Sequence, residues 1–289
     1  MRHIKKRVVV ATLFLLLSPL GILAYTEDAV MVRSRSMDKD IPVNIILPQV
    51  YSDTVQYPVV YLLHGYSDNH MAWSRDGVVG ALADKHNVIV VMPDGGYDSW
   101  YFDSPVVKEY RYETFISHEL VSYVDSCYST VRDRHGRAIT GLSMGGHGAF
   151  YIAMRHQDTF SCMGSLSGGL DIRPFPKNWN IAGRLGAYEQ YPERWEENTV
   201  INMTHLLSPG TMNIVFECGT SDFFYKVNCD MHDKLQKEGI PHDYYVRPGG
   251  HSWTYWLRNI KYQFMYFSDC FNQNRSLAHS SLITDLGLT

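Results

Sequence analysis

Cysteine is scarce in this 289-residue sequence, and its spacing shows neither a C-x-x-C pair nor a metal-site pattern. An odd number of cysteines leaves at least one thiol free or paired between chains. We favour buried apolar thiols, while one disulfide stays open if the protein reaches an oxidising compartment. The five are Cys127, Cys162, Cys218, Cys229 and Cys270.

An excess of basic charge is also missing, since the formal net charge is -4 at pH 7. A nucleic-acid partner is therefore not expected. Repeats, linkers and low-complexity runs are absent between residues 25 and 271. With 45% hydrophobic and 13% aromatic residues, the chain is large enough for a single α/β domain with a sizeable core. A polar tail without periodicity follows at residues 272–289.

A long membrane-spanning run is lacking at the N-terminus as well. Residues 1–24 combine a basic start, a short apolar run at residues 8–17, a Pro-Gly break and a small residue at Ala24. This pattern predicts a signal peptide that is cleaved near Ala24. A membrane anchor is the alternative, but the apolar run is short for a bilayer. We therefore expect an exported protein, periplasmic or secreted, without stable membrane association after cleavage.

Strand-like and helix-like segments alternate along residues 25–271. Two strand-like runs at residues 29–37 and 43–48 come first. Further strands are predicted at residues 57–65, 88–95, 137–143, 162–169, 212–219 and 242–250, and helices at residues 78–86, 113–128 and 145–155. Short apolar strands separated by helices predict a mostly parallel central sheet with helices on both faces. Ligands of such sheets bind beyond the carboxyl ends of the strands, so residues that follow strands are informative.

A glycine-rich turn follows one of these strands. The stretch at residues 138–150 reads AITGLSMGGHGAF, with Ser143 between Gly141 and Gly145. G-x-S-x-G at a strand-to-helix junction is typical of a nucleophile elbow, in which the serine stands at the apex of a sharp turn. The amide of Met144 then lies at the start of a helix, where unpaired N–H groups and the helix dipole favour an oxyanion.

A nucleophilic serine needs a base, and thirteen histidines compete for that role. His251 follows a predicted strand in the loop GGHSW and is the strongest candidate. His147 is nearer in sequence, but it lies four residues into the helix and should leave on a different face.

The base needs an orienting acid, and Asp222 lies just beyond the strand at residues 212–219. Glu217 is an alternative within that strand, whereas Asp230 and Asp233 fall on the solvated face of the next helix. The order Ser143, Asp222, His251 is that of the α/β-hydrolase arrangement.

The second oxyanion donor is expected after the strand at residues 57–65. The amide of Tyr66, just past Gly65, is the candidate, and His64 is expected to stabilise this loop. Aromatic residues also follow several strands, where they suit a phenolic acyl group or sugar rings, although packing in the core is an equal alternative. The predicted substrate-binding residues are Trp73, Tyr97, Trp100 and Trp253. Residues 170–211 interrupt the alternation and should cover one side of the site as a partial lid.

Five segments together carry a resemblance to a known family. They read YLLHGYSDNHMAW, VVMPDGGYDSWY, GLSMGGHGAF, CGTSDFFY and PGGHSWTYW. They resemble the esterase D group of α/β-hydrolases, which includes S-formylglutathione hydrolases, tributyrin esterases, feruloyl and acetylxylan esterases of carbohydrate esterase family 1, and mycolyl transferases. The resemblance covers residues 29–271 and implies an ester or thioester hydrolase. It implies Ser143, Asp222 and His251 as the triad, the amides of Tyr66 and Met144 as the oxyanion hole, and no cofactor or metal.

The expected export narrows this function, because S-formylglutathione is a cytosolic thioester. We expect a small-molecule or oligosaccharide ester as substrate, with feruloyl or acetyl esters on plant-wall polysaccharides as first choice. A general short-chain carboxylesterase or a thioesterase is the alternative, and mycolyl transfer and peptidase activity are weaker ones. A non-catalytic carbohydrate-binding protein of the same fold is the alternative from another class.

Overall fold

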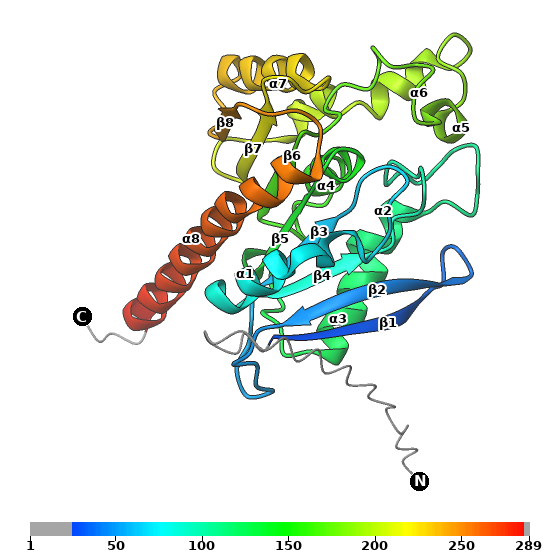
Figure 1. Ribbon diagram of the computed structural model, residues 1–289. Helices are drawn as coiled ribbons and strands as arrows, with labels where there is room; N and C mark the ends of the chain where they lie inside the picture. The colour runs from blue at the N-terminus through cyan, green and yellow to red at the C-terminus, as the bar shows by residue number, and fades with distance from the viewer. Residues whose placement is uncertain (1–24, 286–289) are drawn as a thin grey trace.

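The computed structural model describes residues 25–285, so the segment at residues 1–24 lies outside the described residues (Figure 1). The strands are β1 (Thr26–Ser34), β2 (Lys39–Leu47), β3 (Val59–Leu63), β4 (Ile89–Pro93), β5 (Arg137–Gly141), β6 (Cys162–Leu166), β7 (Asn213–Gly219) and β8 (Asp243–Arg247). The α-helices are α1 (Val78–His86), α2 (Tyr112–Thr114), α3 (Val121–Cys127), α4 (Met144–Arg155), α5 (Ile181–Leu185), α6 (Pro192–Glu197), α7 (Tyr225–Lys237) and α8 (Trp253–Asp285). Short 3-10 segments are η1 (Ala72–Gly77), η3 (Arg134–Gly136) and η4 (Val200–Leu206), and η2 (Phe115–Leu120) is a π segment that joins α2 to α3.

All eight strands form one sheet in the order β1-β2-β4-β3-β5-β6-β7-β8. The β1–β2 and β2–β4 pairs are antiparallel, and every other neighbouring pair is parallel. The mostly parallel sheet expected from the sequence is therefore confirmed. Because the strands from β3 to β8 run in one direction, their carboxyl ends meet at one edge of the sheet (Figure 1).

The central strands are apolar on both faces because both faces are covered by helices. In β3, Val59 and Tyr61 pack into one cluster, while Val60 and Leu62 pack into another on the opposite face. The first cluster includes α3, α4 and α7, and the second includes α1 and α8. Alternate side chains of one strand thus tie the sheet to two separate helical layers.

Helix α8 is not among the helices expected from the sequence. The predicted end of the domain at residue 271 falls inside this helix, which continues to Asp285. Within residues 25–285, none of the helices combines the length and the apolar character needed to cross a bilayer.

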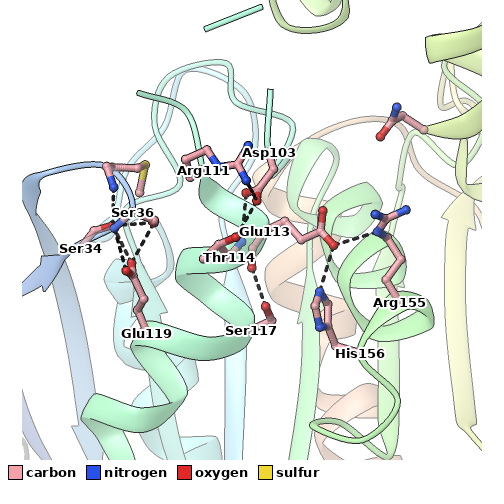
Figure 2. A network of polar contacts seen from close by, with 12 residues as sticks. Ser34, Ser36, Asp103, Arg111, Glu113, Thr114, Ser117, Glu119, Arg155 and His156 are labelled. Carbon is pink, nitrogen blue, oxygen red and sulfur yellow. Dashed lines mark hydrogen bonds and ion pairs between the residues drawn. The ribbon is translucent and has the colours of Figure 1, made fainter. Parts of the chain in front are cut away.

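Two carboxylates, of which Glu113 is buried, fasten the helix at residues 112–127 to its neighbours (Figure 2). Glu119 accepts backbone hydrogen bonds from Arg35 and Ser36 in the β1–β2 turn, at 2.9 and 2.8 Å. At the start of the same helix, Glu113 accepts hydrogen bonds from Arg155 at 2.8 Å and from His156 at 2.9 Å. These contacts link the edge of the sheet and the end of α4 to one helix.

Burial alone would raise the pKa of Glu113, but the hydrogen bonds from His156 and Arg155 outweigh it and hold the pKa below its usual value. We predict that Glu113→Gln lowers the free energy of unfolding by about 2 kcal/mol at pH 7. The carboxylate stabilises the fold above its unfolded pKa of about 4.3, and this contribution is lost as the pH falls through the lower folded value. Urea unfolding at several pH values from 7 to 3 measures the difference in the free energy of unfolding between variant and wild type. A difference that does not decrease below pH 4 would contradict the stabilising role of the ionised Glu113.

Candidate active site

Ser143 stands at a sharp turn between β5 and α4. Its backbone has φ 54° and ψ -117°, a conformation that side chains rarely adopt. Its amide donates to the carbonyl of Leu166 at 2.9 Å, which fixes the turn against β6. The glycines explain why the turn can form. A Cβ on Gly145 would lie 2.5 Å from the carbonyl oxygen of Leu63, so only glycine lets α4 start this close to β3.

Ser143, His251 and Asp222 form one hydrogen-bonded chain. The distance from Ser143 Oγ to His251 Nε2 is 2.9 Å, and His251 Nδ1 lies 2.9 Å from Asp222 Oδ2. Asp222 also accepts a hydrogen bond from the amide of Phe224 at 2.8 Å. With Nδ1–H donating to the carboxylate, Nε2 is left as an acceptor for the serine hydroxyl. The three side chains predicted from the sequence therefore meet, in the geometry that activates a serine.

The loops that carry Asp222 and His251 are held together by an extension of the β7–β8 pairing. The amide of Thr220 donates to Arg247 at 3.0 Å, and that of Ser221 donates to Gly249 at 2.9 Å. The two loops approach so closely that a Cβ on Gly219 would lie 2.3 Å from the carbonyl oxygen of Gly249. Backbone contacts thus fix the imidazole relative to the carboxylate.

Two backbone amides are available beside the serine. Within residues 25–273, the amides of Tyr66 and Met144 have no protein acceptor. Met144 is the first residue of α4, where the helix dipole favours negative charge. The loop that carries Tyr66 is held by His64, whose Nδ1 donates to the carbonyl of Gly65 at 2.7 Å while Nε2 accepts from the amide of Gly95 at 2.7 Å. His64 thus has the contacts expected of a loop-stabilising residue.

The alternative base and acid have other partners. His147 is fully buried in α4, where its Nδ1 donates to the carbonyl of Trp100 at 3.1 Å. Burial lowers the pKa of His147 to about 4, so this imidazole is neutral at pH 7. Glu217 forms a buried ion pair with Arg247, and burial raises the pKa of this carboxyl to about 7. Asp230 pairs with Lys226 on the exposed face of α7.

Two of the predicted substrate-binding residues are buried. Trp73 and Trp100 are each only 1% exposed, so their ring faces are not open to a substrate. Trp73 Nε1 donates to the carbonyl of Leu63 at 3.0 Å and thereby supports the end of β3. Trp253 is half-buried between Trp73 and the guanidinium of Arg75.

The fourth predicted aromatic residue is exposed to solvent. Two further aromatic residues at the site were not predicted from the sequence. Tyr97 is 59% exposed and packs against Tyr66 with ring centroids 5.1 Å apart. Phe223, which is 51% exposed, lies 4.2 Å from the ring of His251 and 5.4 Å from that of Trp179. The position of Phe223 directly after Asp222 was a signal in the sequence. Trp179 had none, because the segment at residues 170–211 lacks periodicity; this segment does reach the site, as expected.

The remaining chemistry of the site is simple. Within residues 25–285, no group of three or more His, Cys, Asp or Glu side chains is arranged to hold a metal ion. All five cysteines are free thiols, and Cys162, Cys218 and Cys270 are buried.

A family model described as "Putative esterase" matches residues 34–266 of the chain. The chain belongs to this esterase family. An acetyl esterase of Caldicellulosiruptor saccharolyticus is 28% identical over 257 residues, which cover 81% of this chain and 95% of that protein. An esterase of Mycobacterium tuberculosis is 30% identical over 237 residues, which cover 72% of this chain and 52% of that protein. A solved ferulic acid esterase superposes with a TM-score of 0.75 at 25% identity and covers 86% of this chain and 98% of that one.

These findings confirm the resemblance noted in the sequence, and the α/β-hydrolase fold with it. The protein is a carboxylic ester hydrolase.

The close approach of Gly145 to β3 gives a test of the elbow. In Gly145→Ala, the added Cβ would collide with two backbone carbonyl oxygens, those of Leu63 at 2.5 Å and His64 at 2.6 Å. Neither oxygen can turn away as a side chain would, so the loop that carries His64 and Tyr66 must shift. We predict a loss of about 100-fold in kcat/KM, because displacements of about 1 Å have such effects.

Gly210→Ala is the matched control, since Gly210 has open space around it and strain only from its φ of 79°. It should cost some stability but keep the kcat/KM of the folded enzyme. Wild-type kcat/KM in Gly145→Ala would show that the close approach is not required.

Proposed function

We propose that the protein is an exported serine esterase in which Ser143 is the nucleophile, His251 the base and Asp222 the acid that orients it. The observation that carries this proposal is the continuous chain of hydrogen bonds from Ser143 through His251 to Asp222. Export is supported by the composition of residues 1–24, which has the parts of a signal peptide.

The first half-reaction forms an acyl-enzyme. His251 Nε2 takes the proton of Ser143 as Oγ attacks the ester carbonyl, and the carbonyl oxygen becomes an oxyanion. The amides of Tyr66 and Met144 stabilise this charge, which is greatest in the transition state. The C–O bond then breaks, and the alcohol leaves with the proton from His251.

The second half-reaction returns the serine. Water attacks the acyl carbon as His251 takes its proton, and the acid leaves when Oγ recovers that proton. Asp222 keeps Nδ1 protonated throughout and stabilises the imidazolium in both halves. Phe224 contributes through its amide, which holds the carboxylate in the plane that the imidazole needs.

For the natural substrate we propose acetyl or feruloyl esters on plant-wall polysaccharides or oligosaccharides. The names of the similar proteins, an acetyl esterase and a ferulic acid esterase, support this class. The exposed ring of Phe223 beside His251 and the exposed ring of Tyr97 against Tyr66 support a substrate with flat or cyclic parts.

Removal of the nucleophile tests the proposed chemistry. Ser143→Ala should lower the hydrolysis of p-nitrophenyl acetate at least 1,000-fold, of the order seen when a triad member is removed. A fluorophosphonate probe should label wild type and fail to label the variant, and both should unfold at a similar temperature. Retained turnover or labelling in the variant would remove Ser143 from the mechanism.

A panel of esters tests the proposed substrate class. We expect the purified protein to release acetate from acetylated xylan or ferulate from methyl ferulate with a higher kcat/KM than for p-nitrophenyl butyrate, and to leave a peptide amide intact. A preference for p-nitrophenyl butyrate over both would favour a general short-chain carboxylesterase. A folded protein that binds xylan but escapes fluorophosphonate labelling would favour the non-catalytic alternative.

A further inference from the structure

Two stacked aromatic rings border the imidazole of His251. Phe223 lies against the imidazole at 4.2 Å between centroids with an angle of 36°, and Trp179 stacks on Phe223 at 5.4 Å with an angle of 24°. We call this pair the Phe223–Trp179 face. Phe223 is 51% exposed, so the face is open to solvent. Aromatic side chains are common in the lining of ligand sites, and a ring beside the reacting group can contact a substrate.

Trp179 is held in place by its neighbours. Its carbonyl accepts a hydrogen bond from Trp100 Nε1 at 3.1 Å, and the adjacent Asn180 donates to Asp98 at 2.7 Å. Trp179 and Asn180 both have left-handed backbones, with φ of 46° and 52°. A strained backbone persists only where its surroundings fix it, so the ring of Trp179 is positioned before any ligand arrives.

The chemistry of the first half-reaction places one part of the ester next to this face. The leaving oxygen must come within about 3 Å of His251 Nε2 to receive its proton. The carbonyl oxygen points instead to the amides of Tyr66 and Met144. The alcohol portion of the ester is therefore the part that lies against the imidazole and its neighbour Phe223.

We propose that the Phe223–Trp179 face is a subsite for a ring carried by the alcohol of the ester, an aryl ring or the apolar face of a pyranoside. This inference rests on the proposed function, since it uses His251 as the proton donor. It assigns specificity for the leaving group to Phe223, which follows Asp222 in the sequence, and to Trp179, which lies in the segment at residues 170–211. Tyr66, in the loop after β3, packs against Tyr97, in the loop after β4, and neither is part of this subsite.

Two isomeric esters separate the alcohol side from the acyl side. Benzyl acetate and methyl phenylacetate have the same atoms and one methylene between ring and ester, but the ring belongs to the alcohol in the first and to the acid in the second. Methyl acetate lacks a ring and measures any general loss. The comparison is the ratio of variant to wild-type kcat/KM for each ester.

Phe223→Leu keeps an apolar side chain but removes the ring, and Phe223→Tyr keeps the ring. We expect Phe223→Leu to lower kcat/KM for benzyl acetate about tenfold more than for the other two esters, on the scale of aromatic pair energies. Phe223→Tyr should keep the wild-type preference for benzyl acetate, because it keeps the ring. Trp179→Leu should act in the same direction. Tyr245→Leu is a control at another exposed ring, 37% exposed on β8, and should leave the three ratios equal.

Three results would overturn the subsite. A larger loss for methyl phenylacetate would put the ring on the acyl side. Equal losses for all three esters would reduce Phe223 to a support for His251, while the proposed esterase function would stand. A wild-type protein that hydrolyses none of the three would remove the proposed function and the subsite together. For a monoacetylated methyl xyloside, Phe223→Leu should lower kcat/KM as much as it does for benzyl acetate. A loss no larger than that for methyl acetate would show that the subsite does not bind a pyranoside.

Discussion

The close approach of the β5–α4 turn to the end of β3 is the constraint on which the site depends. Glycine at 145 lets α4 begin against the carbonyl oxygens of Leu63 and His64, and the turn then forces Ser143 into a left-handed backbone. This contact does two things at once. It presents the hydroxyl at the edge of the sheet, and it brings the loop of Gly65 and Tyr66 close to Ser143 and Met144. The strain at Ser143 is offset by the hydrogen bond from its amide to the carbonyl of Leu166 and by the burial of α4 from Met144 to Met154.

The rest of the site follows from parallel strands that end at one edge. Because β7 and β8 pair in parallel, the loops after them leave the sheet together, and their backbone bonds continue as far as Gly249. Asp222 and His251 are thus brought side by side although 29 residues separate them in sequence. From the loop after β8, the imidazole of His251 then reaches Ser143 in the turn after β5. The aromatic surroundings of His251, Phe223 at its face and Trp256 at its edge, limit the ways in which the ring can turn.

The strands and the three side chains that meet at the site, Ser143, Asp222 and His251, could be predicted from the sequence because each has a local signal. Parallel strands read as short apolar runs, and residues directly after such runs are confined to one edge. The roles of the aromatic residues could not be predicted, because burial is a tertiary property. Trp73 and Trp100 follow strands as Tyr97 does, yet only Tyr97 is open to solvent. Trp179 lies in a segment without periodicity, and its place against Phe223 depends on contacts with Trp100 and Asp98 that no local pattern encodes.

A structure of the protein after reaction with a fluorophosphonate tests the central claim most directly, because the adduct mimics the tetrahedral intermediate. We predict phosphorus bonded to Ser143 Oγ, and a phosphoryl oxygen at about 2.7–3.1 Å from the amides of both Tyr66 and Met144. His251 should remain in contact with Asp222. Phosphorus on another residue, or a phosphoryl oxygen that points away from both amides, would contradict the account.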